Sequence, residues 1–235
     1  MRYWTSEVLN GANPVEIGKM GKVFNRGTSD GSAMRIAGSG LVNPGDLEGA
    51  IKTAITMTKI SHGTQHAYSG SCAIACAVAE ALTENSSVDS IVEAAIYGAK
   101  NGEIIGNKEA RQASGARVLP VMLRAIDIAR NANSIDEASI LIEENCGASC
   151  DIQTAVAIVM GLFVACDGDI MDTLIACANY GCDTDTYACI AGMIVGAYKG
   201  YGNIPYNFVE KFDKANPGLD FDWASDELIR IINER

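Results

Sequence analysis

The sequence has little of what marks a nucleic-acid-binding, secreted or membrane-spanning protein. Its 235 residues carry 18 Lys and Arg against 29 Asp and Glu, so the net charge of −11 provides no basic surface for nucleic acid or an anionic membrane. The longest apolar run, residues 155–166, is too short to cross a bilayer. The first residues also lack the apolar segment of a signal peptide. These features predict a cytoplasmic protein with neither nucleic acid nor membrane as its partner.

The cysteines do not follow the spacing of a disulfide framework or of a zinc site. Cys146 and Cys150 are spaced C-x3-C, and no second pair at zinc spacing follows them. The other six lie in apolar segments, where a free cysteine behaves as a small hydrophobe; they are Cys72, Cys76, Cys166, Cys177, Cys182 and Cys189. We therefore predict eight reduced, structural cysteines.

Strand signals are weak, because no run of β-branched residues alternates over several positions. Helical periodicity instead dominates from about residue 46. Asp46 is placed to cap one amphipathic segment, Ser86 or Ser87 a second, and Ser134 with Glu137 forms the pattern of a capping box before a third. Each of these segments is predicted to be a helix with one buried face.

Two further segments, residues 72–82 and 155–166, are apolar on nearly every side. A helix of this kind is normally surrounded by other helices. We therefore predict a single all-α domain over residues 1–235, with two buried central helices wrapped by amphipathic ones. Residues 1–45 differ: they are glycine-rich, show little periodicity and contain the polar stretch NRGTSDGSAMR. We expect mostly loop there, and a long glycine-rich loop in a helical protein is often functional.

The stretch GCDTDT, residues 181–186, precedes the last long apolar helix. Asp and Thr are favoured helix caps, so these side chains can be interpreted as a helix start alone. A single cap needs one such residue, however, and two carboxylates this close repel each other unless a cation holds them. Oxygen donors at this density suit Mg²⁺ or Mn²⁺. In that case the helix behind would be packed closely through Gly192 and Gly196, which would hold the ligands on rigid backbone.

Four blocks resemble the ADP-ribosylglycohydrolase family, of the dinitrogenase reductase-activating glycohydrolase type, and they occur in the family's order. ANYGCDTDTYACIAGMIVGAYKGYGNIP is similar to its aspartate signature, and GTSDGSAMRIAGSGL to its glycine-rich ligand loop. SHGTQHAYSGSCAIACAVAEAL resembles its histidine segment, and DIQTAVAIVMGLFVACDGDIMDTLIACANYG its preceding helix pair. The blocks cover most of the chain from about residue 20 to 208.

The resemblance implies an orthogonal multi-helix bundle with two Mg²⁺ or Mn²⁺ ions at the base of a cleft. It also implies hydrolysis of the glycosidic bond of an ADP-ribosyl or related ribosyl group, small or protein-linked. Carried over by position, the metal ligands would be Asp183, Asp185 and Thr186, and the substrate-binding residues Thr28, Ser29, Asp30, Gly31, Ser32 and His62. For His66, a satisfied histidine at a helix start is the favoured interpretation.

The chain departs from the family pattern at its N-terminal side. It contains no Thr-Asp-Asp motif, which forms the family's other metal half-site, and no match to the family's assisting acidic residue, so no catalytic residue is assigned. Asp30 stands where Asn is usual, and Gly38 where Pro is usual. We expect an N-terminally shortened bundle. A truncated or split enzyme, a homo-oligomer or partner chain that completes the site, and an inactive paralogue that only binds ADP-ribose or has a structural role all stay open.

Overall fold

The computed structural model describes residues 9–19 and 27–234, and within them the chain is helical with no β-strand, which confirms the all-α prediction. The elements in chain order are α2 (Pro14–Lys19), η1 (Asp30–Arg35), α3 (Ala37–Leu41), α4 (Leu47–Thr58), α5 (Gln65–Ala81), α6 (Val88–Glu109), α7 (Val118–Asn131), α8 (Ile135–Cys146), α9 (Ile152–Ala165), α10 (Ile170–Asn179), α11 (Thr184–Lys199), η2 (Tyr201–Asn203), α12 (Tyr206–Ala215) and α13 (Phe221–Asn233).

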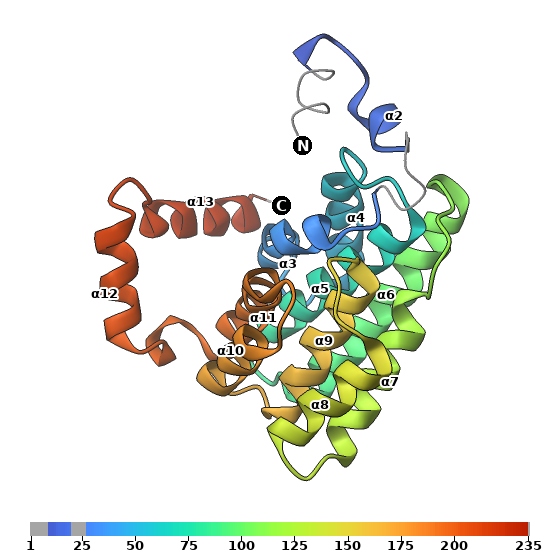
Figure 1. Cartoon of the computed structure of the whole chain (residues 1–235). Coiled ribbons are helices and arrows are strands. Elements are labelled where there is room, and N and C mark those ends of the chain that lie inside the picture. The colour runs from blue at the N-terminus through green and yellow to red at the C-terminus, as the bar shows by residue number, and fades with distance from the viewer. Residues whose placement is uncertain (1–8, 20–26, 235) are drawn as a thin grey trace.

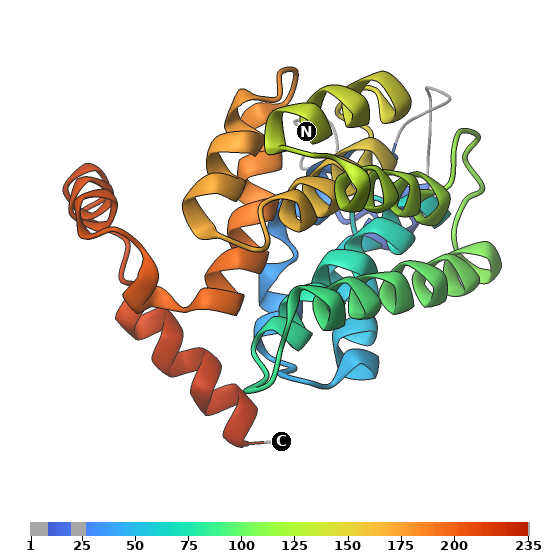
Figure 2. The same cartoon turned by 90° about the horizontal axis from the view of Figure 1, so that it is seen from below.

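Helices α5 and α9 form the centre of the molecule (Figure 1). Almost every residue of both is buried, because α9 and the part of α5 from Cys72 onward are apolar on nearly every side and must be surrounded by other helices. Helices α3, α4 and α6 pack on α5, while α7, α8 and α11 pack on α9, as the view from below also shows (Figure 2). The prediction of two central helices wrapped by amphipathic ones is confirmed.

The predicted helix starts are found, with one difference. Asp46 accepts a hydrogen bond from Gly49 N at 3.0 Å, and Ser87 forms a reciprocal capping box with Ser90. Ser134 likewise accepts from Glu137 N at 3.1 Å. The Glu137 carboxylate, however, accepts from Asn133 N at 2.6 Å rather than from the backbone of Ser134, so the capping box predicted there is shifted by one residue.

Close helix packing through glycine occurs on α6 rather than on α11, where we had predicted it. A Cβ atom added to Gly102 would lie 2.5 Å from the carbonyl oxygen of Tyr68, and one at Gly106 would lie 2.7 Å from Gln65 Cα. Both contacts are with the backbone of α5, which cannot move aside. By contrast, a Cβ at Gly196 would meet open space, and one at Gly192 makes an ordinary contact. The prediction for Gly192 and Gly196 is therefore wrong, because the face of α11 that carries them is only half-buried.

All eight cysteines are free thiols, in agreement with the sequence. Cys182 and Cys189 are nevertheless exposed, although their apolar sequence neighbours predicted burial. Cys182 precedes the start of α11 and has a positive φ of 60°, a conformation that places it in the turn before the helix. Cys150 is also exposed.

Residues 9–19 and 27–45, where the sequence predicted mostly loop, hold the short helices α2, η1 and α3. Their shortness explains why no 3.6-residue periodicity appears in this part of the sequence. In the described ranges, each helix is too short or too polar to cross a lipid bilayer.

Replacing Gly102 with Ala should lower the free energy of unfolding by about 2 kcal/mol or more, because its methyl group would push α6 away from the α5 backbone. The control is Gly196→Ala, whose methyl group meets open space and should raise stability by about 0.5–1 kcal/mol. Chemical denaturation of both variants measures the difference. Equal stability of the two variants would contradict this account of the α5–α6 interface.

Candidate functional site

The glycine-rich loop lies against the start of α9. Ser29 forms an isolated antiparallel bridge with Asp151, in which Asp30 N donates to Cys150 O and Ile152 N donates to Thr28 O, both at 2.9 Å. These backbone bonds hold the loop as a short extended segment, so that η1 begins directly beside the N-terminus of α9.

The same loop is joined to the start of α5. The Thr64 hydroxyl donates to Gly27 O at 2.6 Å and also accepts from Ala67 N at 3.2 Å, which makes Thr64 the cap of α5. The Thr64 side chain therefore caps the N-terminus of α5 and also fixes the beginning of the loop. The loop is held between the N-termini of the two central helices.

Three carboxylates from distant parts of the sequence interact here. Asp30 is at the start of η1, and Asp151 and Asp183 are the residues before α9 and α11. Asp30 is 4% exposed, and its Oδ2 has no hydrogen-bond partner among the described residues. The negative charges of Asp183 and Asp151 both act on it. The site is thus acidic and partly desolvated.

The Asp183 carboxylate does not cap its own helix. Among the described residues, Asp183 makes no side-chain cap hydrogen bond, whereas Asp46, Asp169 and Asp220 at the same position of other helices each accept one from the backbone. The interpretation of this carboxylate as a simple helix cap therefore does not describe the structure. Its charge instead acts on Asp30 and on Cys150, which belong to other parts of the chain.

The two closest carboxyls titrate in opposite directions. Burial raises the pKa of Asp30 to about 7, and hydrogen bonding with Asp183 and the charge of Asp183 add to this shift. Partial burial would raise the pKa of Asp183 too, but its hydrogen bonds with Asp30, Cys150 and Thr186 hold the pKa below its usual value. Two ionised carboxylates this close repel each other, so a proton or a cation near the pair is favoured.

His62 lies beside the loop. Its Nε2 is 2.9 Å from Ser29 Oγ, its Nδ1 is 2.8 Å from Ser61 Oγ, and Arg35 donates to Ser61. Burial and the charge of Arg35 lower the pKa of His62 to about 4, so the ring is neutral near pH 7. A Cβ added to Gly31 would lie 3.3 Å from His62 Nε2, so a larger side chain at this position would press on the ring.

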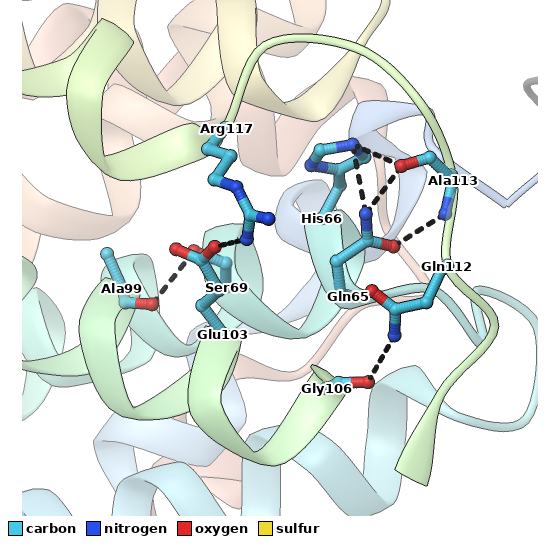
Figure 3. A network of polar contacts seen from close by, with 9 residues as sticks. All are labelled: Gln65, His66, Ser69, Ala99, Glu103, Gly106, Gln112, Ala113 and Arg117. Atoms are coloured by element: carbon cyan, nitrogen blue, oxygen red, sulfur yellow. Dashed lines mark hydrogen bonds and ion pairs between the residues drawn. The ribbon is translucent and has the colours of Figure 1, made fainter. Parts of the chain in front are cut away.

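His66 belongs to a separate structural network (Figure 3). Its Nε2 is 3.1 Å from Ala113 O, and Gln65 exchanges two hydrogen bonds with the backbone of Ala113. Nearby, Arg117 pairs with Glu103. These contacts attach the segment between α6 and α7 to the start of α5, in agreement with the interpretation of His66 as a satisfied histidine.

The structure brings most of the sequence-predicted residues together: Thr28, Ser29, Asp30, Gly31, His62, Asp183 and Thr186. Asp185 is exposed in the first turn of α11, and Ser32 is fully buried. Sequence reasoning missed Asp151 and Cys150. The signals for Asp151 were its position before an apolar helix and at the start of the third family-like block along the chain. In the structure the Thr28 hydroxyl donates to the Asp151 carboxylate at 3.4 Å, which joins it to the loop.

These carboxylates suit a divalent cation in part. An ion beside Asp30 Oδ2 would relieve the repulsion with Asp183, and hard oxygen donors are the ligands that Mg²⁺ and Mn²⁺ prefer. Within residues 9–19 and 27–234, however, no three His, Cys, Asp or Glu side chains are grouped so that they could hold an ion alone. The described residues therefore provide part of a coordination shell of about six ligands.

Comparison with known proteins gives two findings. The family model described as ADP-ribosylglycohydrolase matches residues 3–234. The uncharacterized protein YegU of Escherichia coli (strain K12) is 26% identical over 234 residues, which cover 95% of this chain and 66% of that protein. The chain thus spans slightly less than two thirds of the length of this relative.

Replacing Asp30 with Asn should stabilise the metal-free protein near pH 8 by about 1 kcal/mol, because no charge is then buried beside Asp183. The wild-type carboxyl holds its proton up to about pH 7 when folded, but only up to about pH 4 when unfolded. Wild-type stability relative to the variant should therefore fall as the pH rises between these two values.

Urea unfolding in EDTA across this pH range measures the difference. Asp226→Asn, at an exposed position of α13, is the control and should change stability little at any pH. An Asp30→Asn variant less stable than the wild type near pH 8 would contradict this expectation, because it would show that other groups already stabilise the Asp30 carboxylate.

Proposed function

The chain belongs to the ADP-ribosylglycohydrolase family, and we propose that it is a hydrolase that cleaves the glycosidic bond of an ADP-ribosyl or related ribosyl group with Mg²⁺ or Mn²⁺. The observation that supports this most directly is the Asp30–Asp183 pair beside the glycine-rich loop. A buried carboxylate oxygen without a partner, facing a second carboxylate, is costly unless a cation compensates it.

Asp183, Asp185 and Thr186 would hold the cation, with Asp30 contributing from the loop. All are oxygen donors, and Asp183 is held by rigid backbone at the start of α11. When bound, Mg²⁺ or Mn²⁺ would orient water and stabilise charge as the bond to the leaving group breaks. We expect two ions in a complete site.

The loop would bind the ribosyl ligand. Backbone amides of a glycine-containing segment can approach phosphate or sugar oxygens closely, and Gly31 leaves the space beside His62 open. Both ring nitrogens of neutral His62 are hydrogen-bonded to serine hydroxyls, so a ribose hydroxyl would bind the ring by replacing Ser29 at Nε2, without adding charge. The contact of His62 with Ser61 keeps the ring in a defined position for this role.

A second candidate function is binding of ADP-ribose without turnover. The incomplete set of ligating side chains in the described part of the chain favours it, as does the absence of a residue in this chain that matches the family's assisting acid. In that case the protein retains the loop and the cation, while the chemistry requires groups from elsewhere.

Two measurements separate the candidates. Incubation with ADP-ribosyl-arginine or nucleoside substrates, with Mg²⁺ and with Mn²⁺, should release a ribosyl product if the chain is a hydrolase. Calorimetry with ADP-ribose reports binding alone. Binding without product at high protein concentration supports the second candidate, and neither binding nor product contradicts both.

Replacing Asp183 with Asn should remove stabilisation by divalent cations, because the carboxylate that faces Asp30 is lost. At a Mn²⁺ concentration of about 100 times the dissociation constant, the wild type should gain about 2.7 kcal/mol, or about 5 °C in melting temperature. Thermal unfolding with and without Mn²⁺ measures this gain.

Asp169→Asn is the matched control, because Asp169 occupies the same position before α10 but accepts a backbone hydrogen bond from Asp172. This variant should lose some stability and keep the full response to Mn²⁺. If Asp183→Asn responds to Mn²⁺ as the wild type does, the proposed cation site is wrong.

A further inference from the structure

The C-terminal helices α12 and α13 form an arm, residues 206–233, that projects from the helical body (Figures 1 and 2). Every residue of both helices is exposed or half-buried. The rings of Phe212 and Phe221 lie 5.4 Å apart and join the two helices to each other. The arm nevertheless exposes large apolar side chains: Phe208, Phe212, Leu219, Phe221, Trp223, Ile229 and Ile231.

These side chains are arranged as a face rather than scattered singly. On α12, Phe208, Val209 and Phe212 are three or four residues apart, or adjacent, and so share one side of the helix. Lys211 is three residues from Phe208 and borders this side. An unpartnered amphipathic helix with such a face is typical of a docking segment.

The helical body carries a groove whose apolar and acidic lining complements the apolar side of α12 and its bordering Lys211. It has a volume of about 480 Å³ and lies between α8 and α10, which supply none of the carboxylates of the candidate site. Its apolar part includes Ile140 and Ile175, which are 57% and 49% exposed. Its charged residues are Asp136 and Asp172, both acidic and both in first helical turns.

The α12 face and this groove match in size, apolarity and charge. A helix of 10 residues is about 15 Å long, and docking would place its two Phe rings against the isoleucines of the groove. Lys211 beside the rings would then meet the carboxylates of the groove. In the described chain the Glu210 carboxylate already pairs with Lys214 at 2.8 Å, so Lys211 is the principal cation of this edge.

We propose that α12 of one molecule docks in the α8–α10 groove of a second copy, and that the exchange is reciprocal. The same two surfaces are then used twice about a two-fold axis, so the assembly closes as a dimer. The Phe and Ile side chains are only about half exposed beforehand, so two Phe side chains in each of two grooves, with the isoleucines that they cover, bury on the order of 800 Å². This area is below that of a standard specific interface, so the dimer is expected to be weak and to depend on concentration. The inference is independent of the proposed function.

The test uses charge reversal in full-length protein. Lys211→Glu places a negative charge against the acidic groove, and the pair Asp136→Lys with Asp172→Lys places positive charges against Lys211. Sedimentation velocity over a range of concentrations should show a wild-type dimer. Each variant alone should dissociate with a dissociation constant at least about tenfold higher.

Mixing the two variants gives the decisive measurement. In a mixed dimer one interface pairs Glu with Lys, and the other pairs the native Lys211 with the native aspartates. Both interfaces are then attractive, so the mixture should dimerise about as tightly as the wild type. Lys100→Glu, an exposed charge reversal on α6, is the control and should leave the dimer unchanged.

Phe208→Ser provides a second test, because Phe208 lies on the docking face but outside the Phe212–Phe221 contact that joins the two helices, and it should also shift the protein to monomer. Circular dichroism melting of each variant checks that the body remains folded. A wild-type protein that is monomeric at all concentrations would overturn the proposal. A dimer whose dissociation constant does not change in these variants would also overturn the proposal. So would a mixture of the two charge-reversal variants that stays monomeric.

Discussion

The fold depends on the burial of two helices that have no polar side. Because α5 and α9 are apolar all round, each must be enclosed by neighbours, and the amphipathic helices supply that enclosure. The closest contact is made by glycines of α6 against the backbone of α5. This enclosure leaves the N-termini of the central helices accessible to the loop of residues 27–35, which crosses both of them.

The candidate site is a consequence of that arrangement. Helix N-termini carry unsatisfied amides and a partial positive charge, which favours carboxylates nearby. Asp151 and Asp183 both occupy such positions, and neither folds its side chain back onto its own helix. Their negative charges instead act on Asp30 and raise its pKa, so the positive helix ends offset only part of the repulsion among the three carboxylates and the place suits a cation.

The arm and the site are separate features of one chain. The site draws on the loop near residue 30 and the start of α11, whereas the arm is α12 and α13 beyond η2. The proposed exchange of arms uses the groove between α8 and α10, on elements that supply none of the carboxylates of the site.

The sequence by itself determined the fold class, the two central helices and the capped starts of α4, α6 and α8, because these follow from local periodicity and cap chemistry. The four blocks of family resemblance also pointed to the correct family and to residues near 30, 62 and 183. Only the tertiary structure decided that Asp183 faces Asp30 rather than its own amides, that Asp151 joins them, and that glycine packing occurs on α6. Those facts depend on contacts between residues as much as 153 positions apart, and no local pattern encodes which helix ends will meet.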